Sequence, residues 1–164
     1  MVTIALLSAV GLVAIDQLIK WWAVMALQGA GTVTMIPGVM ELVYVQNNGA
    51  AWGLFAGKTW LLVGVTGLAI VAAIVALLMK KVKSTFLIWS ISVVIAGGLG
   101  NLIDRIFRVD AVGRHFVVDY LNFSFIEFPV FNFADCCVVL GMIAIVVYIL
   151  FFDGKKKSKP EAAA

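Results

Sequence analysis

Four long apolar runs dominate this sequence and restrict the folds that it can adopt. They cover about residues 4–27, 59–79, 84–105 and 130–152, and each is near the roughly 20 residues that a helix needs to cross a bilayer. Hydrophobic residues make up 63% of the 164-residue chain and charged residues only 13%, which is more apolar surface than a soluble domain of this size can bury. The sequence therefore predicts an all-α membrane protein with four transmembrane helices in a single domain, residues 1–164.

The basic residues indicate how these helices are oriented. Two lysine clusters follow the second and fourth runs, at Lys80, Lys81, Lys83, Lys155, Lys156, Lys157 and Lys159. The remaining connections and their edges carry four basic residues, Lys58, Arg105, Arg108 and Arg114. With four spans both clusters fall on one side, and the positive-inside rule predicts that this side, with both termini, is cytoplasmic.

The lysine clusters are typical of membrane topology and not of nucleic-acid binding, because no basic stripe is interleaved with stacking aromatic residues. We therefore expect no nucleic-acid partner. The lysine-rich tail, residues 154–164, is predicted to be disordered.

Two long connections, residues 28–58 and 106–129, are then predicted to lie outside the cytoplasm. The first has β-branched runs on both sides of Pro37-Gly38, a pair that suits the centre of a tight turn. We expect a small β-cradle at about residues 31–47, resting on the membrane, and a short interfacial helix at residues 53–55. Interfacial anchors are expected at Trp21, Trp22, Trp52, Trp60 and the aromatic stretch 123–131.

Some intramembrane carboxylates have cations nearby in the sequence. Asp16 and Lys20 are four residues apart, so they share a helix face and are predicted to form a structural ion pair. Asn101, Asp104 and Arg105 lie together in GGLGNLIDR, which we interpret as a polar brace that could also hold a substrate backbone. The glycines of this segment allow another helix to approach closely.

Asp119 and Asp135 have no such cation at helical spacing. Sixteen residues separate them, which is enough for the chain to leave the membrane and return at the same depth. Facing carboxylates share one proton, so one acts as an acid and the other as a base, and together they can activate water against a peptide carbonyl. Asn132 is expected to donate hydrogen bonds to Asp135. The alternative is that Asp119 caps a turn and Asp135 pairs with Arg105 or Arg114.

Other chemistries have less support. His115 is the only histidine, so a metal site would need mostly carboxylates, and we expect no metal. Cys136 and Cys137 continue into an apolar run, where we interpret them as packing residues. A small proton-coupled transporter or a structural membrane subunit is the alternative class of protein, but a transporter should show an internal repeat or broken helices, and the sequence indicates neither.

Five segments together resemble one known family, the lipoprotein signal peptidases (signal peptidase II) of bacterial membranes. They are DQLIK at 16–20, NNGAAWG at 47–53, GGLGNLIDR at 97–105, VVDY at 117–120 and FNFAD at 131–135. Each segment alone is weak, but five in the family's order on four spans are specific. One departure is the stretch between Arg105 and Asp119, which is longer than we expect in the family.

The resemblance implies an aspartic endopeptidase that removes signal peptides from diacylglyceryl-modified prolipoproteins, cutting before the lipidated cysteine. It implies that Asp119 and Asp135 are catalytic, and that eight residues support them or bind substrate: Asp16, Lys20, Asn47, Gly49, Asn101, Asp104, Arg105 and Asn132. It also implies a β-cradle and a short helix over a site at the outer surface of the bacterial cytoplasmic membrane, and it implies no organic cofactor. We expect a monomer whose partners are lipid-modified prolipoproteins and membrane lipids.

Overall fold

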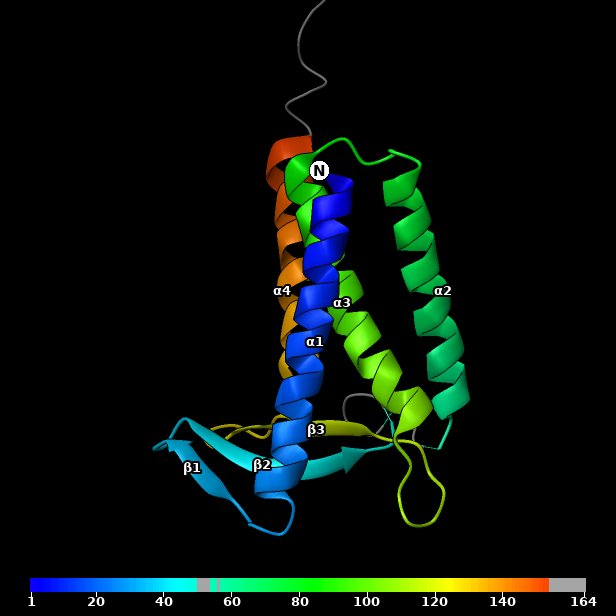
Figure 1. Ribbon diagram of the computed structural model, residues 1–164. Coiled ribbons are helices and arrows are strands. Elements are labelled where there is room, and N and C mark those ends of the chain that lie inside the picture. The colour runs from blue at the N-terminus through cyan, green and yellow to red at the C-terminus, as the bar shows by residue number, and fades with distance from the viewer. Residues whose placement is uncertain (50–53, 56, 154–164) are drawn as a thin grey trace, which may run out of the picture.

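The computed structural model describes residues 1–49, 54–55 and 57–153, and four long helices dominate it (Figure 1). They are α1 (Val2–Leu27), α2 (Thr59–Leu78), α3 (Thr85–Phe107) and α4 (Phe133–Tyr148), and a short π-helix, Ile149–Asp153, continues α4. Each is long and apolar enough to cross a membrane, α4 together with the π-helical residues that follow it. The predicted four-helix membrane fold is confirmed. The fourth helix begins three residues later than its apolar run, because Phe131 forms a β-bridge with Leu121 and Asn132 is the N-cap of the helix.

α3 is the central helix of the bundle. It packs against α1, α2 and α4. In the most apolar 18-residue stretch of α3, 44% of the residues are buried inside the protein, against 11–17% for the corresponding stretches of the other three helices. The outer faces of those helices expose large apolar side chains such as Leu7, Leu68 and Leu140. A surface of this kind is stable in lipid and not in water.

A small antiparallel sheet lies across one end of the bundle (Figure 1). Its strands are β1 (Val33–Ile36), β2 (Met40–Asn47) and β3 (Val117–Phe123), in the order β1-β2-β3. The β1–β2 turn is the predicted one: Val39 N donates to Ile36 O at 3.0 Å, and Gly38 has a positive φ of 70°, which a tight turn of this kind requires at its third position. The predicted β-cradle is therefore confirmed.

β3 is a strand that the sequence reasoning missed. The sequence pattern predicts that the stretch after residue 116 is a connection that leaves the membrane and returns, but residues 117–123 pair with β2 over most of its length. The cause is tertiary, because Phe116, Val118 and Tyr120 pack with Ala23 and Leu27 at the end of α1. That packing holds β3 flat against the bundle and gives its backbone a partner strand.

The connection between α3 and β3 forms a turn that projects from the sheet end of the molecule (Figure 1). Asp110 N donates to Arg114 O at 2.9 Å, and Val109 and His115 form an isolated β-bridge. His115 meets the ring of Trp60 edge-on, with centroids 5.0 Å apart. The stretch between Arg105 and Asp119, which we expected to be longer than in the family, thus forms a compact hairpin between α3 and β3.

Several predictions of local structure fall on residues outside the described ranges. The short helix predicted at residues 53–55 and the anchor predicted at Trp52 fall mostly on such residues. Of residues 50–56 only Leu54 and Phe55 are described, both in a turn. The tail at residues 154–164 also lies outside.

The α3–α4 interface generates a prediction about stability. A Cβ atom added at Gly97 would collide with Ala134 O and the Val138 side chain, whereas one added at Gly64 of α2 would meet nothing within 4 Å. We expect Gly97→Ala to destabilise the protein by about 1–3 kcal/mol, since the helices must separate. The matched change Gly64→Ala should be neutral or stabilising by up to about 1 kcal/mol. Thermal unfolding in detergent measures both, and a Gly97→Ala melting temperature at or above that of the wild type would contradict this packing.

Candidate active site

Asp119 is placed by the sheet. It is the third residue of β3 and only 2% exposed, between the buried Val118 and Tyr120. Val45 of β2 lies opposite it, so Asn47, two residues further along β2, reaches the same face. Asn47 Nδ2 donates to Asp119 Oδ2 at 2.8 Å. The register of two strands that are distant in sequence therefore positions this carboxylate.

Asp135 is placed by the start of α4. Asn132 is the N-cap of the helix, and its Oδ1 accepts from Asp135 N at 3.0 Å, while Asp135 Oδ2 accepts from Asn132 N at 3.0 Å. This reciprocal capping box holds the carboxylate at the helix N-terminus, where the dipole favours negative charge. Asn101 of α3 adds a third contact, from Nδ2 to Asp135 Oδ1 at 2.7 Å.

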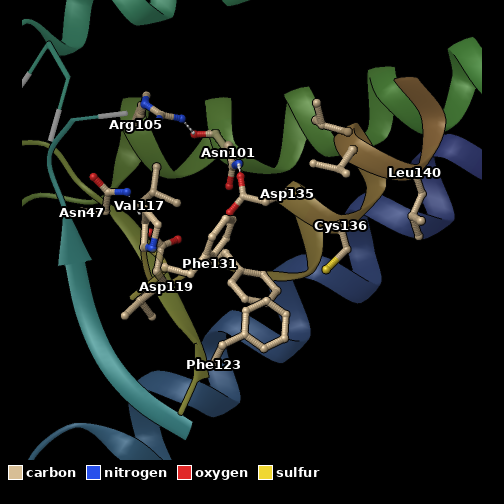
Figure 2. A pocket seen from close by; sticks show the side chains of 15 residues that line it. Asn47, Asn101, Arg105, Val117, Asp119, Phe123, Phe131, Asp135, Cys136 and Leu140 are labelled. Atoms are coloured by element: carbon tan, nitrogen blue, oxygen red, sulfur yellow. Dashed lines mark hydrogen bonds between the residues drawn. The ribbon is translucent and has the colours of Figure 1, made fainter. Parts of the chain in front are cut away.

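Asn132 connects the two carboxylates. Its fully buried side chain donates from Nδ2 to Asp119 Oδ1 at 2.6 Å, while its backbone N–H binds Asp135. The predicted hydrogen bond from Asn132 to Asp135 is present, but the backbone N–H donates it. The amide oxygen of Asn132 is used for the helix cap, so its NH₂ group points to the other aspartate. Figure 2 shows Asp119 and Asp135 on the wall of one pocket, from a strand and a helix respectively.

The environments of the two carboxylates differ. Burial, and then the negative charge of Asp135, raise the pKa of Asp119 to about 7, although hydrogen bonds from Asn47 and Asn132 oppose the shift. Asp135 is more accessible and lies at a helix N-terminus. The burial of Asp119 therefore favours its protonated form up to about neutral pH.

A cluster of buried charges lies beneath the two aspartates. Lys20 Nζ is 3.0 Å from Asp16 Oδ2 and 3.2 Å from Asp104 Oδ2, and all three side chains are at most 2% exposed. The Asp16–Lys20 pair is as predicted. Arg108 Nε also binds Asp104, at 2.9 Å. Sequence reasoning did not predict this contact of Arg108, the C-cap residue of α3, although its position four residues after Asp104 was a usable signal.

Arg105 does not pair with either of the two aspartates. Its guanidinium donates to Asn101 O at 3.3 Å and to Gly49 O at 3.0 Å. Arg114 pairs with Asp110 at 2.8 Å, on the surface of the hairpin. The alternative in which Asp135 pairs with Arg105 or Arg114 is therefore wrong. Arg105 instead binds the carbonyl of the buried Gly49. Arg105 and Gly49, which were both predicted as supporting residues, are therefore in direct contact.

The pocket has a volume of about 630 Å³, and Figure 2 shows Asn47, Arg105 and Asp119 toward one end of it and Cys136 and Leu140 toward the other. Asn101 and Asp135 complete its polar lining, and the rest of its wall is mainly apolar, including Phe123, Phe128, Phe131, Val138 and Leu140. Cys136 also lines the pocket, whereas Cys137 is buried, so only Cys137 is the packing residue that we expected. In the described part of the chain, no three His, Cys, Asp or Glu side chains gather to hold a metal ion.

The comparisons with known proteins agree with each other. Residues 8–151 match the family model described as signal peptidase (SPase) II. The lipoprotein signal peptidase of Clostridium acetobutylicum is 41% identical over 157 residues, covering 94% of this chain and 97% of that protein. That of Lactococcus lactis subsp. lactis is 38% identical over 141 residues, covering 86% and 89%.

Two solved structures are also similar, and both are described as bacterial membrane enzymes. One superimposes with a TM-score of 0.81 at 27% identity, covering 99% of this chain and 95% of the other. The second has a TM-score of 0.78 at 29% identity and covers 92% and 94%.

The raised pKa of Asp119 generates a prediction about stability. A carboxyl group with a native pKa near 7 and an ordinary unfolded pKa stabilises the fold when protonated, and this stabilisation is lost as the pH rises through about 7. Between about pH 5 and pH 8 the wild type should lose on the order of a few kcal/mol of unfolding free energy. Asp119→Asn, which stays neutral, should lack this slope.

Asp110→Asn is the matched control, because hydrogen bonds from the backbone of Arg114 lower the pKa of Asp110 and place its titration below this range. Chemical unfolding in detergent at both pH values measures the slopes. Equal slopes for the wild type and Asp119→Asn would contradict the protonated state of Asp119.

Proposed function

This chain belongs to the signal peptidase II family and processes the signal peptides of prolipoproteins in the cell membrane, and we propose that it does so with Asp119 and Asp135 as its catalytic dyad. The observation that carries this proposal is the position of Asn132, which binds one carboxylate through its side chain and the other through its backbone. Both carboxylates line the same pocket. An acid and a base are therefore held at fixed positions around one bound peptide.

In the proposed reaction, Asp135 takes a proton from a water molecule whose oxygen attacks the scissile carbonyl carbon. Asp119 transfers its proton to the carbonyl oxygen, which gives a neutral tetrahedral diol. The C–N bond then breaks as the proton on Asp135 passes to the departing amine and a diol hydroxyl returns its proton to Asp119. Both carboxyl groups end in their initial states, and the two proton transfers are general base and general acid catalysis.

The two ends of the pocket suit a lipid-modified peptide. We infer that the polar end, with Asn47 and Arg105, binds the backbone of an extended segment and that the apolar wall receives small and apolar side chains. Leu140 lines the pocket and is 64% exposed on the outer surface of α4, so the pocket opens on a surface that faces lipid. A diacylglyceryl chain can therefore stay in the bilayer while the bond before its cysteine reaches the dyad.

The orientation in the membrane is proposed from charge. Lys80 and Lys81 lie beyond the end of α2 that is remote from the sheet (Figure 1), and the positive-inside rule favours the cytoplasm for that end. Both termini are then cytoplasmic, and the site lies at the outer leaflet. Trp21 and Trp60, each 63% exposed, belong to the sheet ends of α1 and α2, as expected of residues at the outer interface.

The dyad is tested by cleavage of a diacylglyceryl-modified precursor in mixed micelles. Asp119→Asn and Asp135→Asn should each lower kcat by at least about 1,000-fold, because each removes one of two groups that act as a unit. Asp110→Asn, on the exposed hairpin, should cleave at the wild-type rate. Wild-type cleavage by either dyad variant, with its fold verified by thermal unfolding, would show that the dyad assignment is wrong.

The pH dependence of the wild-type enzyme provides a separate test. Because the proposed acid is protonated Asp119, whose pKa is raised to about 7, kcat/KM should fall as the pH rises through about 7. The rate is measured from about pH 5 to pH 9 at constant ionic strength. A rate that keeps rising to the alkaline end would exclude a protonated carboxyl group as the acid.

A further inference from the structure

Lys20 is a buried ammonium group whose three protons each have an acceptor. Its side chain on α1 is fully buried. Nζ lies 3.0 Å from Asp16 Oδ2, 3.2 Å from Asp104 Oδ2 and 2.8 Å from Asn101 Oδ1. The three acceptors come from two helices, and an ammonium group has three N–H bonds to donate. Lys20 is thus fully satisfied at the centre of the buried charge cluster.

Two of these acceptors hold the residues that precede the aspartates. Asp104 Oδ2 also accepts from Val118 N at 3.1 Å, and Val118 precedes Asp119 on β3. Asp16 accepts through Oδ1 from Ala134 N at 3.1 Å, and Ala134 precedes Asp135 on α4. The backbone on the N-terminal side of each proposed catalytic residue is therefore bound to a carboxylate that Lys20 holds.

The third acceptor reaches the dyad directly. Asn101 Oδ1 accepts from Lys20 and from Asn132 Nδ2, the latter at 3.1 Å, so its NH₂ group must point the other way, to Asp135 Oδ1 at 2.7 Å. Rotating the amide by 180° would put its NH₂ group against an ammonium group, and two donors repel. Lys20 and Asn132, which both donate to Oδ1, therefore hold the amide of Asn101 in the orientation that presents its NH₂ group to Asp135.

We propose that Lys20 is a positioning residue for the dyad, which fixes the separation of Asp119 and Asp135 through its three contacts with Asp16, Asp104 and Asn101. This inference rests on the proposed function of the dyad. It goes beyond the structural ion pair expected from the spacing of Asp16 and Lys20, because an ion pair alone needs neither the contact with Asn101 nor the backbone contacts at Val118 and Ala134. Lys20 touches no substrate and acts through its acceptors.

Charge balance alone is the competing explanation. The cluster contains two anions, Asp16 and Asp104, and two cations, Lys20 and Arg108. Asp119, Asp135 and Arg105 are the other charged groups near it, on β3, α4 and α3. Removing the ammonium group leaves an unpaired buried anion, which destabilises a protein strongly whatever its role in catalysis. A test must therefore separate the effect of unbalanced charge in the cluster from the effect of losing the contacts that position the aspartates.

Three variants distinguish charge balance from positioning of the aspartates. Lys20→Met removes the ammonium group and keeps an unbranched side chain. Lys20→Met combined with Asp16→Asn removes one cation and one anion, so the cluster stays neutral, and the amide oxygen introduced at position 16 can still accept from Ala134 N. Leu77→Ala is the control for lost stability, because Leu77 is fully buried in the other core cluster, with Ile88 and Ile95. Each is purified in detergent and assayed for thermal unfolding and for kcat and KM with the diacylglyceryl precursor.

We expect Lys20→Met to lose stability and to lower kcat about 100-fold with KM changed by less than about 3-fold, because small displacements of catalytic groups have effects of this size. The neutral double variant should regain most of the melting temperature but keep the 100-fold lower kcat. Leu77→Ala should melt earlier and retain the wild-type kcat below its melting temperature.

A double variant that recovers the wild-type kcat together with its stability would show that Lys20 only balances charge, and would overturn the proposal. Should Lys20→Met fail to fold, the double variant still decides, since its cluster contains no unpaired ion. Asp135→Asn is measured in the same assay. If Asp135→Asn is inactive and the double variant is fully active, the positioning role is wrong and the dyad stands, whereas an active Asp135→Asn overturns the proposed function itself.

Discussion

The contact on which the rest of this site depends is the bond between Lys20 and the buried carboxylates of Asp16 and Asp104. Isolated charges buried among membrane-spanning helices are unfavourable, and they persist only when they are paired and hydrogen-bonded. Here each carboxylate also accepts a backbone N–H: Ala134 binds the second oxygen of Asp16, and Val118 shares the Asp104 oxygen that binds Lys20. The helices, the sheet and the start of α4 thus converge on one ionic cluster.

The site itself combines two kinds of secondary structure. A strand presents Asp119 in a buried setting that raises its pKa, and a helix N-terminus holds Asp135 in a reciprocal capping box with Asn132. Asn132 joins them because the N-cap position gives it both a free amide NH₂ group and a free backbone N–H. A chain built only of transmembrane helices would not provide this asymmetry, and the small sheet at the end of the bundle supplies it.

Much of the site could be predicted because its residues are chemically unusual where they stand. Asp16, Lys20, Asp104 and Asp135 are charges in apolar helices, and such residues are rare unless they pair or act. The spacing of Asp16 and Lys20 was enough to predict their contact. Spacing within one element could not predict that Asn132 donates to Asp119, that Arg105 binds the carbonyl of Gly49 or that Cys136 lines the pocket. Those contacts join segments that only the folded bundle brings together.

The sequence by itself determined the membrane-spanning helices, the turn at Pro37-Gly38 and the family, because apolar length, turn chemistry and ordered motifs are local properties. It also singled out Asp119 and Asp135, since neither has a cation at helical spacing. Only the tertiary structure decided that residues 117–123 form a strand, and that Asp104 and Asn101 of α3 contact Lys20 of α1. Strand pairing and the orientation of buried amides depend on partners distant in sequence, and a local pattern contains no information about which partner will be near.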